Sequence, residues 1–167
     1  NSAIFPRKSD NTTSDNAINL GLSGHRFASL YLGSGVFLGG TGSANELDHY
    51  EEGTFNCTTS SSGYAIQAQG GRYTRIGRLV HINFVVNFNL VGTSNATVTI
   101  AGLPFTVGSF QSAGSIRENS NTGAIYVINV PPSNTEFSFN AMDGVSNNSN
   151  RRIHNNENYA GSFTYTI

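Results

Sequence analysis

The stretch Leu79–Leu90, which reads LVHINFVVNFNL, decides the fold. Its even-numbered positions are all apolar, whereas the polar residues His81, Asn83, Asn87 and Asn89 occupy odd-numbered positions. Successive side chains of a β-strand point to opposite faces, so this alternation places one apolar row opposite one polar row. A helix would scatter the same residues around its circumference. The stretch therefore predicts one long strand, on the order of 40 Å, with one buried face and one solvated face.

Shorter stretches with the same alternation lie on both sides of this strand. Residues 72–76 precede the two-residue turn Gly77-Arg78, which predicts a hairpin with the long strand. Further candidate strands lie at 63–69, 96–100, 108–116, 124–130, 137–141 and 163–167. No convincing helical period is present, although the acidic residues 46–52 have room for one helical turn. About eight short strands after residue 53, with regularly spaced turn signals, predict an all-β fold, a β-sandwich of jelly-roll type.

The composition excludes several classes of protein. Charged residues make up only 11% of the 167 residues, against about 25% in an ordinary soluble protein. Eleven Phe and seven Tyr argue against disorder. A net charge of −1 is unlike the basic patch that nucleic-acid binding needs. Cys57 is the only cysteine, so no intrachain disulfide is possible, and no apolar run approaches the roughly 20 residues of a membrane span.

The amino-terminal part differs from the rest in its pattern. Between residues 17 and 40, short apolar pieces alternate with glycines, and no piece can bury its apolar side by itself. Stacking against copies from other chains would bury them in a thin intertwined shaft; an extended arm that wraps its own domain is the alternative. The glycine-rich run 39–45 has the composition of a linker. We therefore expect a tail and shaft segment at 1–42 and a β-sandwich head at 43–167.

Several motifs, in order along the chain, carry a resemblance. YEEGTF at 50–55, GRYTRIGRLVHINF at 71–84 and GLPF at 102–105 resemble the C-terminal receptor-binding head of bacteriophage tail fibre and appendage proteins. Residues 19–32 resemble the fibre segments that lead into such heads. The resemblance covers residues 17–105, and none of its motifs is catalytic.

The resemblance implies a homotrimer at the tip of a virion fibre. Its partners would be upstream fibre or tail proteins and a bacterial surface polysaccharide or outer-membrane protein, to which the head attaches the virion. Closed symmetry would also cover strand edges that a charge-poor β surface leaves exposed. Two alternatives remain: a structural fibre or capsid decoration without a ligand, and a depolymerase that cleaves capsule or lipopolysaccharide.

The asparagine-rich loop 143–158 is the predicted recognition surface. Sugar binding draws on planar amides, charged donors and an aromatic platform, and loops on a rigid scaffold usually carry binding residues. The loop and the residue that follows it supply all three kinds of side chain: Asn148, Arg151, Arg152, His154, Asn156 and Tyr159. The alternative is a solvated loop without a ligand. Tyr64 and residues 110–121 are weaker candidates.

Three other clusters have a structural and a functional interpretation. The acidic residues Glu46, Asp48, Glu51 and Glu52, with His49, could bind Ca²⁺ or Mg²⁺ or cleave a glycoside, but their spacing fits no EF-hand loop. We favour a solvated linker or hinge that pairs with Arg72, Arg75 or Arg78, within the chain or across a trimer. Those arginines could instead bind an anionic glycan. The polar row of the long strand could bind sugar hydroxyls or simply face solvent or a neighbouring subunit.

No catalytic or metal site is expected. No serine lies in a nucleophile-elbow motif, and Cys57 has no flanking motif. The polar row of the long strand contains only one histidine, which is too few for a metal site. We therefore predict a binding protein, neither an enzyme nor a carrier of a cofactor.

Overall fold

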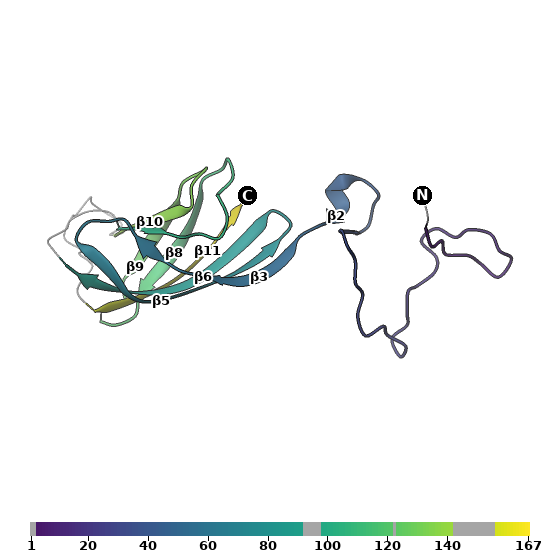
Figure 1. Ribbon diagram of the computed structural model, residues 1–167, viewed down its shortest axis with the longest axis horizontal. Helices are drawn as coiled ribbons and strands as arrows, with labels where there is room; N and C mark the ends of the chain where they lie inside the picture. Colours follow the sequence, from purple (N-terminus) through teal and green to yellow (C-terminus); the bar gives the residue numbers. More distant parts are fainter. Residues whose placement is uncertain (1–2, 92–97, 122, 142–155) are drawn as a thin grey trace. The chain divides into compact units, whose positions relative to one another are not determined.

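The computed structural model describes residues 3–91, 98–121, 123–141 and 156–167. These residues are all-β, with one short 3-10 helix and no α-helix (Figure 1). The chain divides into two compact units, Asn1–Ser34 and Gly35–Ile167. The division falls after Ser34, whereas the linker composition predicted a boundary after residue 42.

The earlier boundary has a structural reason. Strand β1 (Val36–Phe37) pairs antiparallel with β2 (Glu46–Leu47), and the 3-10 turn η1 (Ser43–Asn45) lies between them. The Leu38 N–H donates to the Asn45 carbonyl at 2.9 Å. The glycine-rich run predicted to be a linker is therefore part of a closed turn in the second unit.

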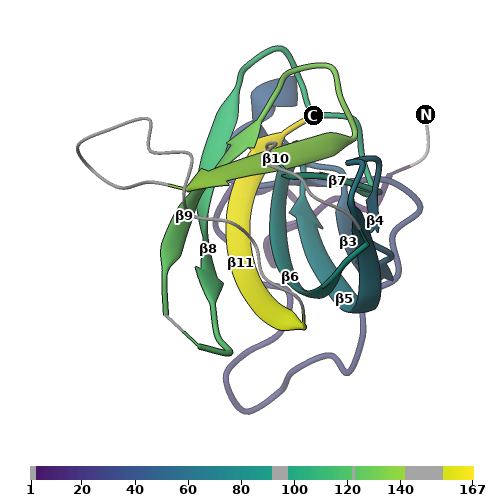
Figure 2. The same cartoon turned by 90° about the vertical axis from the view of Figure 1, so that its left-hand side faces the viewer.

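The rest of the second unit is one nine-stranded antiparallel sheet, in the order β3-β5-β6-β11-β8-β9-β10-β7-β4. Its strands are β3 (Tyr50–Phe55), β4 (Thr58–Thr59), β5 (Tyr64–Ile76), β6 (Leu79–Leu90), β7 (Val98–Ala101), β8 (Ser112–Glu118), β9 (Ile125–Val130), β10 (Glu136–Ala141) and β11 (Glu157–Thr166). The end strands β3 and β4 are joined by Asn56 and Cys57 alone, so the sheet curls back on itself (Figure 2). The Cys57 N–H donates to the Gln69 side chain on β5, which attaches the connection between the end strands to β5.

The long strand is confirmed, because β6 spans Leu79–Leu90 and its even-numbered side chains Val80 to Phe88 are buried. The hairpin with β5 is also confirmed: Ile76 pairs with Leu79, and Gly77 has the positive φ of 57° that a two-residue turn favours. The strands predicted at 63–69 and 72–76 form one strand, with a register shift between Ile66 and Ala68.

The remaining strands lie close to their predicted positions, with three differences. β11 begins at Glu157, six residues before the predicted strand at 163–167. The acidic segment has no helical turn, since Glu51 and Glu52 lie in β3. The sheet has nine strands instead of about eight, because two of the predicted strands form β5 while β3 and the two-residue strand β4 were not predicted.

The core lies inside the curl, where aromatic rings from β6 meet rings from β10 and β11. The ring centroids of Phe84 and Phe137 are 4.9 Å apart, and those of Phe88 and Phe139 are 6.1 Å apart. Phe88 also contacts Tyr159 of β11, at 5.7 Å between centroids. Strands on opposite sides of the curl therefore share one aromatic core.

Glycines on the inner face allow these rings to lie flat against neighbouring strands. A Cβ at Gly161 would lie 2.8 Å from the Phe84 ring, and a Cβ at Gly71 would overlap the Phe55 ring. Both glycines face their ring across one pair of strands, Gly161 opposite Phe84 and Gly71 opposite Phe55. Large and absent side chains thus alternate along one inner row of the sheet.

The first unit has no comparable core. Its described residues form two isolated β-bridges, Arg7 with Thr13 and Leu22 with His25. None of its described apolar side chains is buried. The exposed large ones are Ile4, Phe5, Ile18, Leu20, Leu22, Phe27, Leu30, Tyr31 and Leu32. One copy of this segment therefore leaves its apolar surface in water.

Candidate functional site

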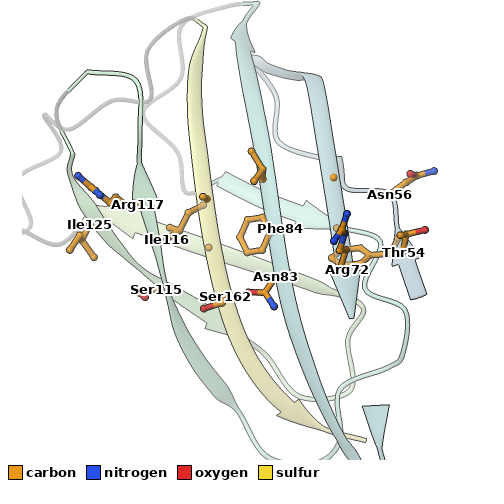
Figure 3. Close-up of a pocket in the computed structure, with 16 residues that line it drawn as sticks. Thr54, Asn56, Arg72, Asn83, Phe84, Ser115, Ile116, Arg117, Ile125 and Ser162 are labelled. Carbon is orange, nitrogen blue, oxygen red and sulfur yellow. The ribbon is translucent and has the colours of Figure 1, made fainter. Parts of the chain in front are cut away.

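A shallow groove of about 910 Å³ runs across the outer face of the sheet. It crosses β3, β5, β6, β11 and β8 (Figure 3). The residues lining it are Thr54, Phe55, Asn56, Gly70, Gly71, Arg72, Asn83, Phe84, Val85, Ser115, Ile116, Arg117, Ile125, Ala160, Gly161 and Ser162.

Strand register builds one polar row along this groove. Arg72 pairs with Thr54 on one side and with Asn83 on the other. Asn83 pairs with Ser162, which in turn pairs with Ser115. Directly opposed residues of antiparallel strands share a face, so these five side chains form one row from β3 to β8. Figure 3 shows Asn83, Ser162 and Ser115 between Arg72 and Arg117.

A second row, two residues along the strands, sets the depth of the groove. Its members on β5 and β11, Gly70 and Ala160, are small. Val85 and Ile125 expose 48% and 60% of their surface in the same row. Ala160 pairs with Arg117, which places Arg117 in this row on the β8 side of the groove. The floor is therefore partly apolar and accessible.

Two arginines dominate the charge of the groove. Arg72 and Arg117 are exposed, and no carboxylate is among the lining residues. Within the described part of the chain, the one ion pair is between His49 and Asp48 at 3.0 Å, and hydrogen bonding to His49 lowers the pKa of Asp48. Neither arginine of the groove is therefore neutralised by a described carboxylate.

The predicted pairing of the arginines with the acidic segment is absent within the described chain. Arg75 instead donates from Nε to the Gly77 carbonyl at 2.8 Å, and its guanidinium lies 5.0 Å from the centre of the Phe105 ring. Arg72 and Arg78 are exposed and make no ion pair with described residues. Pairing across subunits stays a prediction.

A buried carboxylate fixes the turn beside Arg117. Glu118 is 1% exposed and accepts from the backbone N–H groups of Asn121 at 2.9 Å and Gly123 at 3.1 Å, and also from that of Ser120. A Cβ at Gly123 would lie 3.4 Å from Nη2 of Arg117, so the guanidinium lies close to the backbone of this turn. The Glu118 contacts therefore define the surface against which Arg117 rests.

The acidic segment bonds to tyrosines. The Tyr50 hydroxyl donates to Glu52 at 2.5 Å, and the Tyr73 hydroxyl donates to Glu51. These hydrogen bonds raise the pKa of both tyrosines, because the neighbouring carboxylate favours the protonated phenol. Among the described residues, no group of three or more His, Cys, Asp or Glu side chains is placed to hold a metal ion.

The polar row of β6 lies on the outer face, as its alternation predicted. His81 Nδ1 lies 3.0 Å from the Thr164 hydroxyl, and Asn87 donates to the Asn158 side-chain carbonyl at 3.1 Å. Asn83 is the member of this row that lines the groove. The row therefore has two uses: cross-strand hydrogen bonds at His81 and Asn87, and an open amide at Asn83.

The predicted recognition loop lies mostly outside the described residues, which include neither Asn148, Arg151, Arg152 nor His154. Asn156 is described: its φ is 63°, and its N–H donates to the Phe88 carbonyl at 2.9 Å.

Tyr159 differs from the prediction, because it lies in the core with 0% exposure. Its hydroxyl donates to Glu157 at 2.5 Å, and burial with this bond raises the pKa of Tyr159. Its ring is not an exposed platform, because β11 begins before it and turns the side chain inward with Phe163 and Tyr165.

The weaker candidates have different outcomes. Tyr64 is buried and its ring lies edge-on to Phe88 at 6.1 Å. The segment 110–121 contributes Ser115, Ile116 and Arg117 to the groove. Cys57 is buried, and burial raises the pKa of its thiol to about 11.

Ser162 is a groove residue that the sequence did not indicate for binding, and Ser115 and Arg117 were included only in the weaker candidate segment 110–121. Ser162 on β11 lies far along the chain from Ser115 and Arg117 on β8, and the two strands meet only through the register of β11 with β6 and β8. The alternation of β8 and β11 indicates which side chains face outward, but not which strands are neighbours.

Comparisons of the chain with protein-family models, with curated proteins and with solved structures found no match. In the part of the chain that the structure describes, no helix is long and apolar enough to cross a membrane.

Proposed function

We propose that this chain is the receptor-binding head of a virion attachment fibre, and that it binds a bacterial surface polysaccharide reversibly through the outer groove. One observation carries the proposal: an open polar groove, with two arginines that no described carboxylate neutralises, lies on a rigid antiparallel sheet. The motif resemblance to phage tail fibre heads supports the same function.

The groove favours binding over cleavage. Glycoside hydrolases use two carboxyl groups held across the bond that breaks. The lining residues of the groove, all of them described, include hydrogen-bond donors and arginines but no carboxylate. Reversible attachment needs only the donors.

The first unit supports assembly as a parallel homotrimer. Its exposed apolar side chains have no described cover within one copy. Three copies wound together as a shaft would bury these side chains. Each Å² of apolar surface removed from water would stabilise the trimer by roughly 25 cal/mol. A trimer would also present three grooves, so weak single sites would combine into strong attachment.

Two measurements on the full chain test this proposal. Multi-angle light scattering should give the mass of three chains, and the labelled chain should bind some members of a panel of bacterial strains. A monomer would overturn the assembly. Failure to bind any strain would favour a ligand-free structural fibre, and release of oligosaccharides from bound cells would favour a depolymerase.

A further inference from the structure

We infer that the outer groove binds an acidic polysaccharide, a linear glycan whose carboxylate or phosphate groups contact Arg72 and Arg117. The inference rests on the proposed attachment function and names the chemical class of its ligand. It assigns the two arginines as anion-binding residues and the polar row between them as donors and acceptors to sugar hydroxyls.

Charge complementarity is the first argument. A guanidinium offers donors in a planar fork that matches a carboxylate or a phosphate, and hydrogen bonds between charged partners are stronger than neutral ones. Arg72 and Arg117 are both exposed, and neither makes an ion pair within the described chain. With no carboxylate lining the groove, nothing in it repels an anion.

The spacing of the two arginines indicates a linear glycan that carries more than one acidic group. Arg72 lies on β5 and Arg117 on β8, three strand spacings apart, which corresponds to roughly 14 Å. The Arg117 guanidinium lies near the backbone of Gly123 on the β8 side, so the two arginines are placed for separate acidic groups of one glycan. Asn83, Ser162 and Ser115 continue the row of Arg72 to β8, where Arg117 lies two residues further along the strand, so a glycan that crosses the strands would meet polar side chains along its length.

The absence of a stacking surface argues against a neutral sugar. The two aromatic residues among those that line the groove, Phe55 and Phe84, turn their rings into the core, with 9% and 3% exposure. The exposed apolar lining comes from the aliphatic side chains Val85 and Ile125. A neutral sugar would have to bind through hydroxyl contacts alone, whereas an acidic one would add two charge-assisted contacts.

The β8 side of the groove is organised before any ligand binds. Glu118 accepts hydrogen bonds from the backbone of the turn against which Arg117 lies. A side chain that is already oriented loses less conformational freedom on binding. Glu118 is therefore a positioning residue for Arg117.

The test compares two double variants of the full chain on immobilised bacterial polysaccharides in three groups: neutral, carboxylate-bearing and phosphate-bearing. One variant is Arg72→Gln with Arg117→Gln. The matched control is Lys8→Gln with Arg26→Gln, which removes the same charge from exposed basic residues outside the groove. Dextran sulfate serves as a probe for binding by charge alone, and melting temperatures confirm that the variants are folded.

We expect the unchanged chain to retain at least one acidic polysaccharide, and the groove variant to bind it roughly a hundredfold more weakly, about tenfold per arginine. The control should bind within about twofold of the unchanged chain, and binding should weaken as salt screens the charges. Loss of binding to carboxylate-bearing chains alone, or to phosphate-bearing chains alone, would tell which acid is recognised.

Four results would overturn the inference: retention of neutral polysaccharides only, retention of none, equal losses in both variants, or dextran sulfate bound as tightly as any polysaccharide. Binding of the chain to bacterial cells shows whether only this inference fails or the proposed attachment function fails as well. If the groove variant still binds bacterial cells as the unchanged chain does, the inference is wrong while the attachment function stands. If the unchanged chain binds no cells, the attachment function is wrong as well.

Discussion

The two faces of the curled sheet come from the same strands but carry different constraints. On β11, Phe163 and Tyr165 point inward and are buried, whereas their neighbour Thr164 points outward and is exposed. On β6, Phe84 contacts rings of two other strands, while Asn83 beside it lines an open groove. Adjacent residues of one strand therefore have unrelated roles.

The difference between the two faces indicates where amino-acid substitutions are tolerated. Inner side chains fill a close-packed space in which even glycines are required, as Gly161 beneath Phe84 shows. Outer side chains contact little besides solvent and each other, so their identity is open to selection for a ligand. The inner face determines stability, and the outer face determines what can bind.

The largest effect is expected when an inner ring is removed. Phe84→Ala should lower the free energy of unfolding by about 3–5 kcal/mol, because it leaves a cavity among Phe137, Phe163 and Gly161. Urea unfolding of the full chain measures it. The outer neighbour is the control: Asn83→Ala should change stability by less than about 0.5 kcal/mol. Equal losses at the two positions would erase the distinction between the faces.

A smaller loss is expected when an inner glycine gains a side chain. Gly161→Ala places a Cβ 2.8 Å from the Phe84 ring and 2.9 Å from the Ser115 carbonyl oxygen. Overpacking of this kind should lower the free energy of unfolding by about 1–3 kcal/mol. Ser162→Ala, on the outer face one residue further, should leave the urea midpoint nearly unchanged. A neutral Gly161→Ala would show that the rings do not pack as described.

Tyr165 gives an inner-face prediction that depends on pH. Burial raises the pKa of Tyr165 to about 12 from an ordinary 10, so the folded state binds this proton more tightly than the unfolded state does. The stability that the folded state gains from holding this proton more tightly is fully present below pH 10 and is lost as the pH rises through 12. Stability should therefore fall between these values.

The stability of the Tyr165→Phe variant should fall less steeply as the pH rises through this range, since the substitution removes the ionisable hydroxyl. The variant should also be less stable at neutral pH by about 0.5–1.5 kcal/mol, because the bond to the Phe105 carbonyl at 3.0 Å is lost. Thermal unfolding at pH 9 and pH 11.5 measures both. An unchanged pH dependence in the variant would mean that this hydroxyl is not buried.

The smallest effect is expected on the outer face away from the groove. Asn87→Ala breaks the hydrogen bond to Asn158 across β6 and β11, which is close to solvent. The free energy of unfolding should change by less than about 0.5 kcal/mol in urea titration. A loss as large as that of Gly161→Ala would mean that the outer amides also hold the sheet together.

Much of the sheet could be predicted from alternation, and the groove could not. The period of two in Leu79–Leu90 gave both the strand and its faces, because burial of one side leaves a direct mark in the sequence. The groove depends on which strands are neighbours: Ser115 and Ser162 meet through long-range pairing that leaves no local pattern. The sequence assigns Tyr159 to the binding surface beside the loop, because the polar residues before it hide the start of β11.

The shaft-like segment was predicted from apolar pieces that one copy cannot bury, and its described residues do expose them. The pairing of β1 with β2 was missed, since two-residue strands carry too few residues for a period.

A crystal structure of the full chain with an oligosaccharide from a polysaccharide that it retains would test the central claim most directly. The account predicts a ligand that lies across β5, β6, β11 and β8, with acidic groups within hydrogen-bond distance of the Arg72 and Arg117 guanidinium groups. A ligand seated elsewhere, or a groove covered by a second copy of the chain, would contradict it.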